Sequence, residues 1–287
     1  FFTATDGNHG RGVAWAANKL GQKSVVFMPK GSTEYRKQQI ANEGATVTIE
    51  KFNYDDCVRL ATAESKKVEN GVVVQDTAWD GYEDIPNWIM QGYGTLAMEA
   101  SQQLEQSGCN IPTHIVVHAG VGSLAGAMVG YFSNFYHDAI YKPKFIVVEA
   151  DGAACLYKGA VANDGNPRIV EGDLPTIMAG LACGEPNTVS WDILRNHVDY
   201  FVAVPDWVAL LGMRVSAAPL KGDTSIISGE SGAAPLGFIM AVMTMAEYED
   251  LRNELELNEH SKVLCFSTEG NTDPDRYKNI VWYGLDT

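Results

Sequence analysis

The sequence predicts an α/β protein that contains two open parallel sheets. Short apolar runs typical of buried strands alternate with longer stretches in which apolar residues recur at helical spacing. Glycine, proline and small polar residues stand at most of the boundaries between these stretches. This alternation favours parallel strands joined by right-handed crossovers, and such sheets bind ligands beyond the carboxyl ends of their strands.

The first part of the chain repeats a helix-to-strand unit. Helices are predicted over residues 13–20, 33–42 and 55–69, and strands over residues 24–28, 46–49 and 72–74. A long amphipathic helix over residues 88–106 follows. We therefore place a domain boundary here, between a smaller βα domain at 1–104 and a larger α/β domain at 105–287.

The second part restarts the same pattern. Strands are predicted over residues 113–117, 144–149, 200–204 and 262–266, and helices begin at Leu124 and within residues 228–234. Each of these strands runs into a turn rich in small or polar residues. Because such turns gather at one edge of a parallel sheet, we expect them to line one shared crevice.

Composition and charge narrow the function classes. The chain has 287 residues, of which 46% are hydrophobic and 20% charged, and its net charge is −15. This acidity, without a lysine- or arginine-rich cluster, argues against a nucleic-acid or anionic-membrane surface. No apolar run approaches the roughly 18 residues of a membrane span, and no signal-peptide pattern is visible. We expect a cytoplasmic protein.

The cysteines predict neither a metal site nor a disulfide framework. They are scattered without CxxC spacing at Cys57, Cys109, Cys155, Cys183 and Cys265. Buried free thiols are the expected state of such cysteines. A bridge between Cys155 and Cys183 stays open, because both lie near glycine-rich segments that would face one cavity.

The chain opens on a loop suited to binding an anion. Residues 5–12, Thr-Asp-Gly-Asn-His-Gly-Arg-Gly, lead into an alanine-rich helix. Unpaired amides at a helix start favour a carboxylate or phosphate. Asp6 is unusual in such a loop and indicates proton chemistry beside a bound anion. The alternative is that Asp6 caps the helix, which would stabilise it by about 1 kcal/mol. For Asp76, at a strand end, the alternative is a cap on the following turn.

A second glycine-rich turn follows the strand at 113–117. Ala119-Gly120-Val121-Gly122-Ser123-Leu124 opens a helix, and its glycines would let the backbone approach an anion closely. It is not a Walker sequence, and it matches a dinucleotide fingerprint poorly. The turn predicts a phosphate cradle, with a tight packing turn as the alternative.

Taken together, the motifs resemble a known family. The set comprises the loop at 5–12, the turn at 119–124, and three later stretches at 176–186, 228–234 and 267–271. Their order and spacing are similar to those of the fold-type-II pyridoxal-phosphate enzymes, which include threonine dehydratase and the tryptophan synthase β chain. Within that family the likeness is greatest to the diaminopropionate ammonia-lyases, on residues 4–10, 75–79, 85–93 and 118–123.

The resemblance implies roles toward the coenzyme, pyridoxal 5'-phosphate. Asn8 would hydrogen-bond its ring oxygen, Ser267 or Thr268 would face its pyridine nitrogen, and Glu230 would lie near the ring. Its phosphate would lie in a cradle formed by Gly120, Val121, Gly122 and Ser123. A neutral hydroxyl at the pyridine nitrogen leaves the ring uncharged, which suits elimination.

The resemblance also implies roles toward an amino-acid substrate. The amides around Thr5, Gly7 and His9 would hold its carboxylate. In the ammonia-lyases, acids that match Asp6 and Asp76 serve as bases toward the D and L forms of 2,3-diaminopropionate, respectively. The implied reaction is α,β-elimination to pyruvate and ammonia by a homodimer.

The family's Schiff-base lysine lies upstream of the Asn8 loop, where only Phe1-Phe2-Thr3-Ala4 stand here. No lysine of this sequence occupies the matching position. We therefore expect the chain to be an N-terminally truncated part of a longer enzyme, without that lysine and without the first strand or strands of the larger domain.

Three alternatives remain open at this point. A serine or threonine dehydratase would share almost every coenzyme contact, although dehydratases usually have a small neutral residue where Asp6 stands. A catalytically dead protein that binds pyridoxal phosphate or an amino acid would keep the crevice without the lysine. A nucleotide-binding Rossmann protein is the third, and the poor dinucleotide match counts against it.

Overall fold

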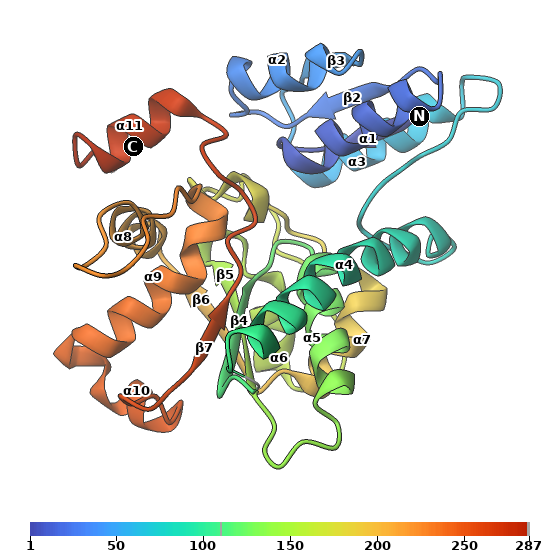
Figure 1. The fold of residues 1–287 in the computed structure, drawn as a ribbon. Coiled ribbons are helices and arrows are strands. Elements are labelled where there is room, and N and C mark those ends of the chain that lie inside the picture. Colours follow the sequence, from blue (N-terminus) through green and yellow to red (C-terminus); the bar gives the residue numbers. More distant parts are fainter. Residues whose placement is uncertain (110, 286–287) are drawn as a thin grey trace.

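The chain folds into two parallel sheets covered by helices, as the computed structural model shows for residues 1–109 and 111–285 (Figure 1). The smaller sheet has the strand order β1-β2-β3, and the larger has the order β6-β5-β4-β7. All pairings between these strands are parallel. The predicted fold class is therefore confirmed.

The smaller sheet consists of β1 (Phe2–Ala4), β2 (Val25–Met28) and β3 (Thr46–Ile49). Its helices are α1 (Asn8–Lys19), α2 (Glu34–Asn42) and α3 (Tyr54–Ser65). Helix α2 begins after Thr33 and α3 after Asn53, and in each the side chain of that residue accepts a hydrogen bond from a first-turn amide. The helix-to-strand unit predicted for this part is present.

The strand predicted over residues 72–74 is reduced to one bridge, between Val73 and Phe2. The side chain of Gln75 explains why the ladder ends there. Its Oε1 accepts from the amide of Ala4 at 2.9 Å, and its Nε2 donates to the carbonyl of Ala4 at 3.1 Å. A side-chain amide thus takes the place of a strand backbone, which no local sequence pattern predicts.

The larger sheet consists of β4 (His114–His118), β5 (Lys144–Ala150), β6 (Tyr200–Val204) and β7 (Val263–Cys265). One face carries α4 (Asp84–Gln106), α5 (Ser123–Phe135) and α7 (Thr188–His197). The other face carries α8 (Asp206–Ala217) and α9 (Glu230–Thr244). Shorter helices are α6 (Cys155–Ala162), α10 (Glu249–Glu254) and α11 (Pro274–Val281).

Residues of β4 alternate between two cores. Ile115 and Val117 pack among residues of α5 and α7, whereas Val116 packs among residues of α8 and α9. Both faces of the sheet are therefore buried, which is typical of doubly wound α/β proteins. Ala97 of α4 belongs to the first of these cores, although the boundary that we predict after residue 104 assigns this helix to the smaller domain. That boundary stays a prediction.

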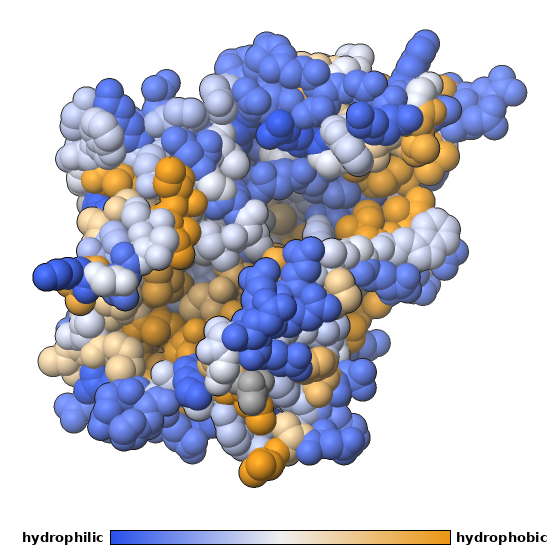
Figure 2. Space-filling model, viewed as in Figure 1, coloured by the Kyte–Doolittle hydropathy of each residue, from blue (hydrophilic) through white to orange (hydrophobic). Residues whose placement is uncertain are grey.

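The carboxyl ends of β1 and β4 point toward the space between the two sheets. The loop after β1 leads into α1, and the turn after β4 leads into α5 (Figure 1). The surface is hollowed between the small-sheet part and α4 (Figure 2). Within the part of the chain that the structure describes, no helix is long and apolar enough to cross a bilayer.

Candidate active site

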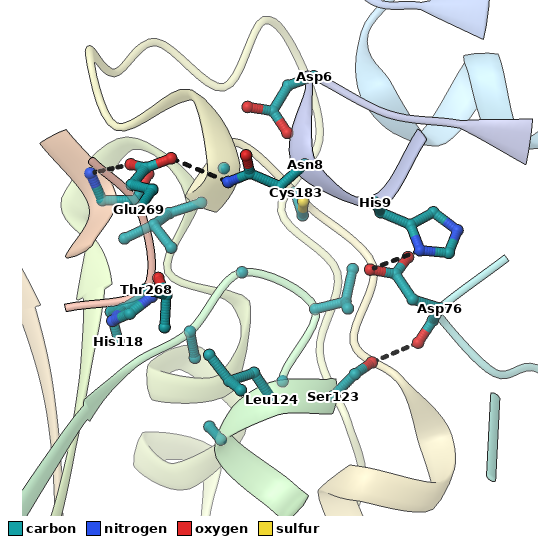
Figure 3. Close-up of a pocket in the computed structure, with 18 of the residues that line it drawn as sticks. Asp6, Asn8, His9, Asp76, His118, Ser123, Leu124, Cys183, Thr268 and Glu269 are labelled. Carbon is teal, nitrogen blue, oxygen red and sulfur yellow. Dashed lines mark hydrogen bonds and ion pairs between the residues drawn. The ribbon is translucent and has the colours of Figure 1, made fainter. Parts of the chain in front are cut away.

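A cavity of about 400 Å³ lies between the two sheets. Figure 3 shows Asp6, Asn8 and His9 on one side of it, Ser123 and Leu124 opposite, and Thr268, Glu269 and Asp76 at the flanks. Of the residues predicted from the sequence, its wall contains Thr5, Asp6, Asn8, His9, Asp76, Gly120, Val121, Gly122, Ser123, Ser267 and Thr268. The structure thus brings together segments that lie far apart in the chain.

Thr5 shapes the loop that precedes α1. Its buried Oγ1 accepts hydrogen bonds from the amides of Gly7 at 2.9 Å and Gly10 at 3.1 Å. A Cβ at Gly10 would lie 2.2 Å from the Thr5 methyl carbon, so only glycine fits there. Because the amide of Gly7 is bonded inside the loop, the amides of Asn8 and His9 are the better candidates for a substrate carboxylate.

Asp6 lies beside a buried arginine and does not occupy the cap position of α1, which is Gly7. The guanidinium of Arg36 is 3.7 Å from the Asp6 carboxylate. Burial raises the pKa of Asp6 to about 6, against the opposing effect of Arg36, and the carboxylate of Glu269 raises it further. A carboxyl group with this pKa exchanges protons near neutral pH, as a general base must.

Asp76 faces the same cavity with different partners. Its carboxylate accepts from the Tyr54 hydroxyl at 3.2 Å and from Gln75 Nε2 at 3.1 Å, and His9 Nδ1 lies 3.9 Å away. The backbone carbonyl of Asp76 accepts from the hydroxyl of Ser123. The two acids of the cavity are thus held differently, Asp6 by a cation and Asp76 mainly by neutral donors.

The turn after β4 forms a close-packed cradle. Gly122 has a φ of 101°, and a Cβ there would lie 2.9 Å from Ser190 Oγ. A Cβ at Gly120 would lie 2.9 Å from the carbonyl oxygen of Gly180. Helix α5 has no side-chain cap, so its first amides are available to an anion. The hydroxyl of Ser123 donates a hydrogen bond to the backbone carbonyl of Asp76. The backbone amide of Ser123 is therefore the better candidate for a phosphate contact.

One flank of the cavity carries hydroxyls and a neutral histidine. Thr268 Oγ1 lies 2.9 Å from His118 Nε2, and Ser267 Oγ donates to Ser228 Oγ at 2.8 Å. Burial lowers the pKa of His118 to about 4, so its ring is neutral at physiological pH. Its Nδ1 is buried without a hydrogen-bond partner among the described residues.

Asn8, which we predict to contact the coenzyme ring oxygen, reaches across the cavity mouth. Its Nδ2 donates to Glu269 Oε2 at 3.0 Å. The other carboxylate oxygen of Glu269 accepts from the amide of Ser231 at 2.9 Å. This bond joins the loop before α1 to the segment after β7, and a ligand in the cavity would compete for it.

Glu230 lies outside the wall that the described residues form, behind Ser231. It is buried, and Arg36 at 3.3 Å and Arg276 at 3.8 Å neutralise its charge. Burial raises its pKa, against the effect of Arg36. Its position supports a role in holding Arg36 more than one beside a coenzyme ring.

Sequence reasoning missed three residues at this site. Arg36 lies inside a polar helix, where nothing local distinguishes it from a solvated arginine. Tyr54 is the first residue of α3, and its hydroxyl reaches Asp76 only because of the fold. Glu269 had a detectable signal, since it directly follows the pair Ser267 and Thr268 in the sequence.

The cysteines named in the sequence analysis are free thiols, including Cys155 and Cys183. Both lie near Gly120: the Cys155 thiol is 3.8 Å from its carbonyl oxygen, and Cys183 lines the cavity. Burial raises the pKa of Cys183 well above its usual range, so its thiol is protonated at neutral pH. Cys155 and Cys183 therefore form no disulfide bridge in this structure.

The residues present fit pyridoxal phosphate. The cradle at 120–122 leaves no room for a Cβ at either glycine and ends at the uncapped start of α5, where a phosphate is favoured. Asn8 and the hydroxyl of Thr268 stand on separate walls of the same cavity. A planar ring with an anionic tail matches this set of donors.

Comparison with known proteins agrees with that fit. The sequence model of the family "Pyridoxal-phosphate dependent enzyme" matches residues 1–269. Diaminopropionate ammonia-lyase of Salmonella typhimurium is 54% identical over 285 residues, which are 99% of this chain and 70% of that protein. The Escherichia coli K12 enzyme of the same name is 50% identical over 289 residues, again 99% of this chain and 70% of that protein.

A solved structure also matches over nearly the whole chain. It is the crystal structure of the Escherichia coli diaminopropionate ammonia-lyase with an aminoacrylate-PLP azomethine reaction intermediate, with 47% identity, a TM-score of 0.91, and coverage of 99% of this chain and 71% of that chain. The same enzyme has been solved in complex with D-serine. The chain therefore belongs to the pyridoxal-phosphate-dependent enzymes and, within them, to the diaminopropionate ammonia-lyase family.

Proposed function

We propose that the full-length protein catalyses the α,β-elimination of 2,3-diaminopropionate and accepts both the D and the L form. The observation that carries the proposal is the pair of carboxylates, Asp6 and Asp76, that face one cavity from different segments. One water is consumed, and the products are pyruvate and two molecules of ammonia. The 54% identity to a diaminopropionate ammonia-lyase supports this substrate.

The chain's own residues would perform the proton transfer. Bound pyridoxal phosphate supplies an electron sink for the pair left at the α-carbon. Asp6 would take the α-proton of the D form and Asp76 that of the L form, since the two enantiomers present this proton to opposite sides. The amides that begin α1 would fix the substrate carboxylate and hence the orientation of the α-carbon.

Residues on the other walls of the cavity would hold the coenzyme and keep its ring uncharged. The hydroxyl of Thr268, held by the neutral ring of His118 at 2.9 Å, would face the pyridine nitrogen without protonating it. Gly120, Val121, Gly122 and the amide of Ser123 would hold the phosphate, and Asn8 would leave Glu269 for the coenzyme's ring oxygen. Of these contacts, the one made by Asn8 replaces a bond that the cavity already contains.

We also propose that the protein acts as a cytoplasmic homodimer. The family resemblance supports the dimer, and the free cysteines of the described residues fit a reducing compartment. Light scattering of the full-length protein at several concentrations measures the assembly. A mass equal to one polypeptide throughout would contradict the dimer.

Substrate profiling tests the proposed reaction against the dehydratase alternative. Pyruvate formation by the full-length protein with pyridoxal phosphate would be measured for D- and L-diaminopropionate, and 2-oxo acid formation for L-serine and L-threonine. We expect the largest kcat/KM for the two diaminopropionates. A preference for L-serine or L-threonine would favour the dehydratase, and coenzyme binding without turnover would favour a binding protein.

A further inference from the structure

We propose that Arg36 is a positioning residue for Asp6, which it keeps ionised and oriented toward the cavity without acting on Asp76. The proposal deepens the function proposed above and rests on it. If Asp6 and Asp76 serve different enantiomers, Arg36 controls one half of the substrate range.

Arg36 is a buried cation at the meeting point of three segments. Its side chain is only 6% exposed. The guanidinium lies 3.7 Å from Asp6 and 3.3 Å from Glu230, and it donates to Thr272 Oγ1 at 3.3 Å. A buried guanidinium with its partners fixed is pre-organised, so its field at Asp6 does not depend on a mobile side chain.

Glu230 anchors this arginine from the side remote from Asp6. Arg276 of α11 lies 3.8 Å from the second oxygen of Glu230, so that carboxylate shares its charge between two cations. Arg36 is therefore not fully neutralised by Glu230 and retains an attraction for Asp6. The charges therefore alternate in sign from α11 to the cavity, in the order Arg276, Glu230, Arg36 and Asp6.

The electrostatics around Asp6 make this cation necessary. The charged groups that face Asp6 are Arg36 from α2, Glu269 after β7 and Asp76 after Val74, and Arg36 is the positive one among them. The nearby Cys183 thiol is protonated because burial raises its pKa. Burial and two carboxylates disfavour a charge on Asp6, and Arg36 opposes them.

Asp76 does not share this support. Its contacts are the hydroxyl of Tyr54, the amide of Gln75 and the ring of His9. Replacement of Arg36 should therefore change the reaction that depends on Asp6 and leave the reaction that depends on Asp76 largely intact. A merely structural role for Arg36 would affect both.

The test measures kcat/KM for pyruvate formation from each enantiomer between pH 6 and 9, with the full-length protein and pyridoxal phosphate. The variants are Arg36→Met, which removes the charge, and Arg36→Lys, which keeps it but cannot contact three partners at once. Lys37→Met is the matched control, because Lys37 is the next residue of the same helix but pairs with Glu34 at 3.1 Å. Asp6→Asn provides the reference for loss of the base.

For Arg36→Met we expect the acid limb of the D profile to move up by about one pH unit, a loss of about fivefold at pH 6 that recovers toward pH 9. The L profile should stay within about twofold of wild type, as should both profiles of Lys37→Met. Arg36→Lys should shift the D limb in the same direction by less. If Arg36→Met does not fold, the shift in Arg36→Lys decides the matter.

Equal losses on both enantiomers at every pH, or an unchanged D profile in the folded Arg36 variants, would overturn the proposal. Failure of the proposed function has a different signature, since wild type would then form no pyruvate from either enantiomer. If Asp6→Asn loses both forms alike, the assignment of Asp6 to the D form fails, and the role of Arg36 fails with it.

Discussion

Asp6 and Asp76 show how one residue type acquires two behaviours from its surroundings. Asp6 is opposite a buried guanidinium and close to other carboxylates, whereas Asp76 accepts hydrogen bonds from neutral groups. A cavity that presents two bases from different directions suits a substrate class that includes both enantiomers. The same geometry makes each base separately testable.

The pKa of Asp6 predicts the pH dependence of one enantiomer. Since burial raises that pKa to about 6, Asp6 is ionised above pH 6 and becomes protonated as the pH falls through this value. The kcat/KM for D-diaminopropionate should therefore fall about tenfold per pH unit below pH 6. Steady-state assays between pH 5 and 8 measure this limb. A D profile that stays flat down to pH 5 contradicts the role of Asp6.

The same shift predicts an effect of Asp6 on stability. The folded-state pKa is raised above the unfolded value, so ionised Asp6 opposes folding, and this effect is present above about pH 6 and absent well below pH 4. Asp6→Asn should raise the free energy of unfolding by about 1 to 2 kcal/mol at pH 8, allowing for the part of the side chain that water reaches.

Urea unfolding of the coenzyme-free protein at pH 8 and at pH 5 measures that difference. The variant and wild type should converge as the pH falls. A variant that is less stable than wild type at pH 8 would show that the ion pair with Arg36 outweighs the burial of the carboxylate.

At the scale of elements, the turn between β4 and α5 determines whether a phosphate can bind. Gly122→Ala places a Cβ 2.9 Å from Ser190 Oγ at a φ of 101°. We expect it to destabilise the protein by about 1 to 3 kcal/mol and to weaken coenzyme binding at least tenfold. Coenzyme titration followed by absorbance, together with thermal unfolding, measures both effects.

Gly130→Ala is the matched control on the same helix. Its Cβ would make an ordinary contact 3.6 Å from Ile193, and alanine favours the helix by up to about 1 kcal/mol. Coenzyme affinity should be unchanged. If the two variants bind the coenzyme equally well, the turn is not the phosphate cradle.

Most of the elements follow from local pattern, and two of the exceptions have tertiary causes. The strands β2 to β7 lie where apolar runs predict them. The strand expected at 72–74 ends early because the side chain of Gln75 bonds to Ala4. We did not predict strand β1 or the helices α6, α7, α8, α10 and α11. In α6 the first amides are satisfied by Glu149 of β5, whose two oxygens accept from Leu156 and Tyr157 at 2.9 and 2.6 Å.

The residues of the candidate site also fall into those that local sequence predicts and those that depend on the fold. Loops with a glycine signature, such as 5–12 and 119–124, could be predicted because the backbone itself forms the site. Arg36 and Tyr54 could not, because their contribution depends on which segments the fold places opposite them. Glu230 is predicted to lie near the coenzyme ring, and that stays a prediction; in the structure it pairs with two arginines.

At the scale of the whole molecule, the cavity belongs to neither sheet alone. Across it, Asn8 bonds to Glu269 at 3.0 Å, and outside it Arg59 with Glu185 at 2.5 Å and Asn53 with the carbonyl of Gly172 at 3.0 Å also join the small-sheet part to the rest. A ligand bound between the sheets therefore stabilises both parts together.

Removal of the coenzyme should lower the Tm of the full-length protein, because a ligand that binds only the folded state adds about 2.7 kcal/mol at a hundredfold excess over its Kd. Calorimetry with increasing pyridoxal phosphate measures the effect. Pyridoxal without phosphate is the control, and it should stabilise less since it cannot use the cradle. A Tm independent of the coenzyme contradicts its binding between the sheets.

One measurement tests the division of labour between the two acids directly. It is the kcat/KM of full-length Asp6→Asn and Asp76→Asn for D- and L-diaminopropionate at pH 8. We predict a crossed pattern, in which Asp6→Asn loses at least about a hundredfold on the D form and Asp76→Asn loses as much on the L form, while each retains most activity on the other. Equal losses on both enantiomers from each variant would contradict it.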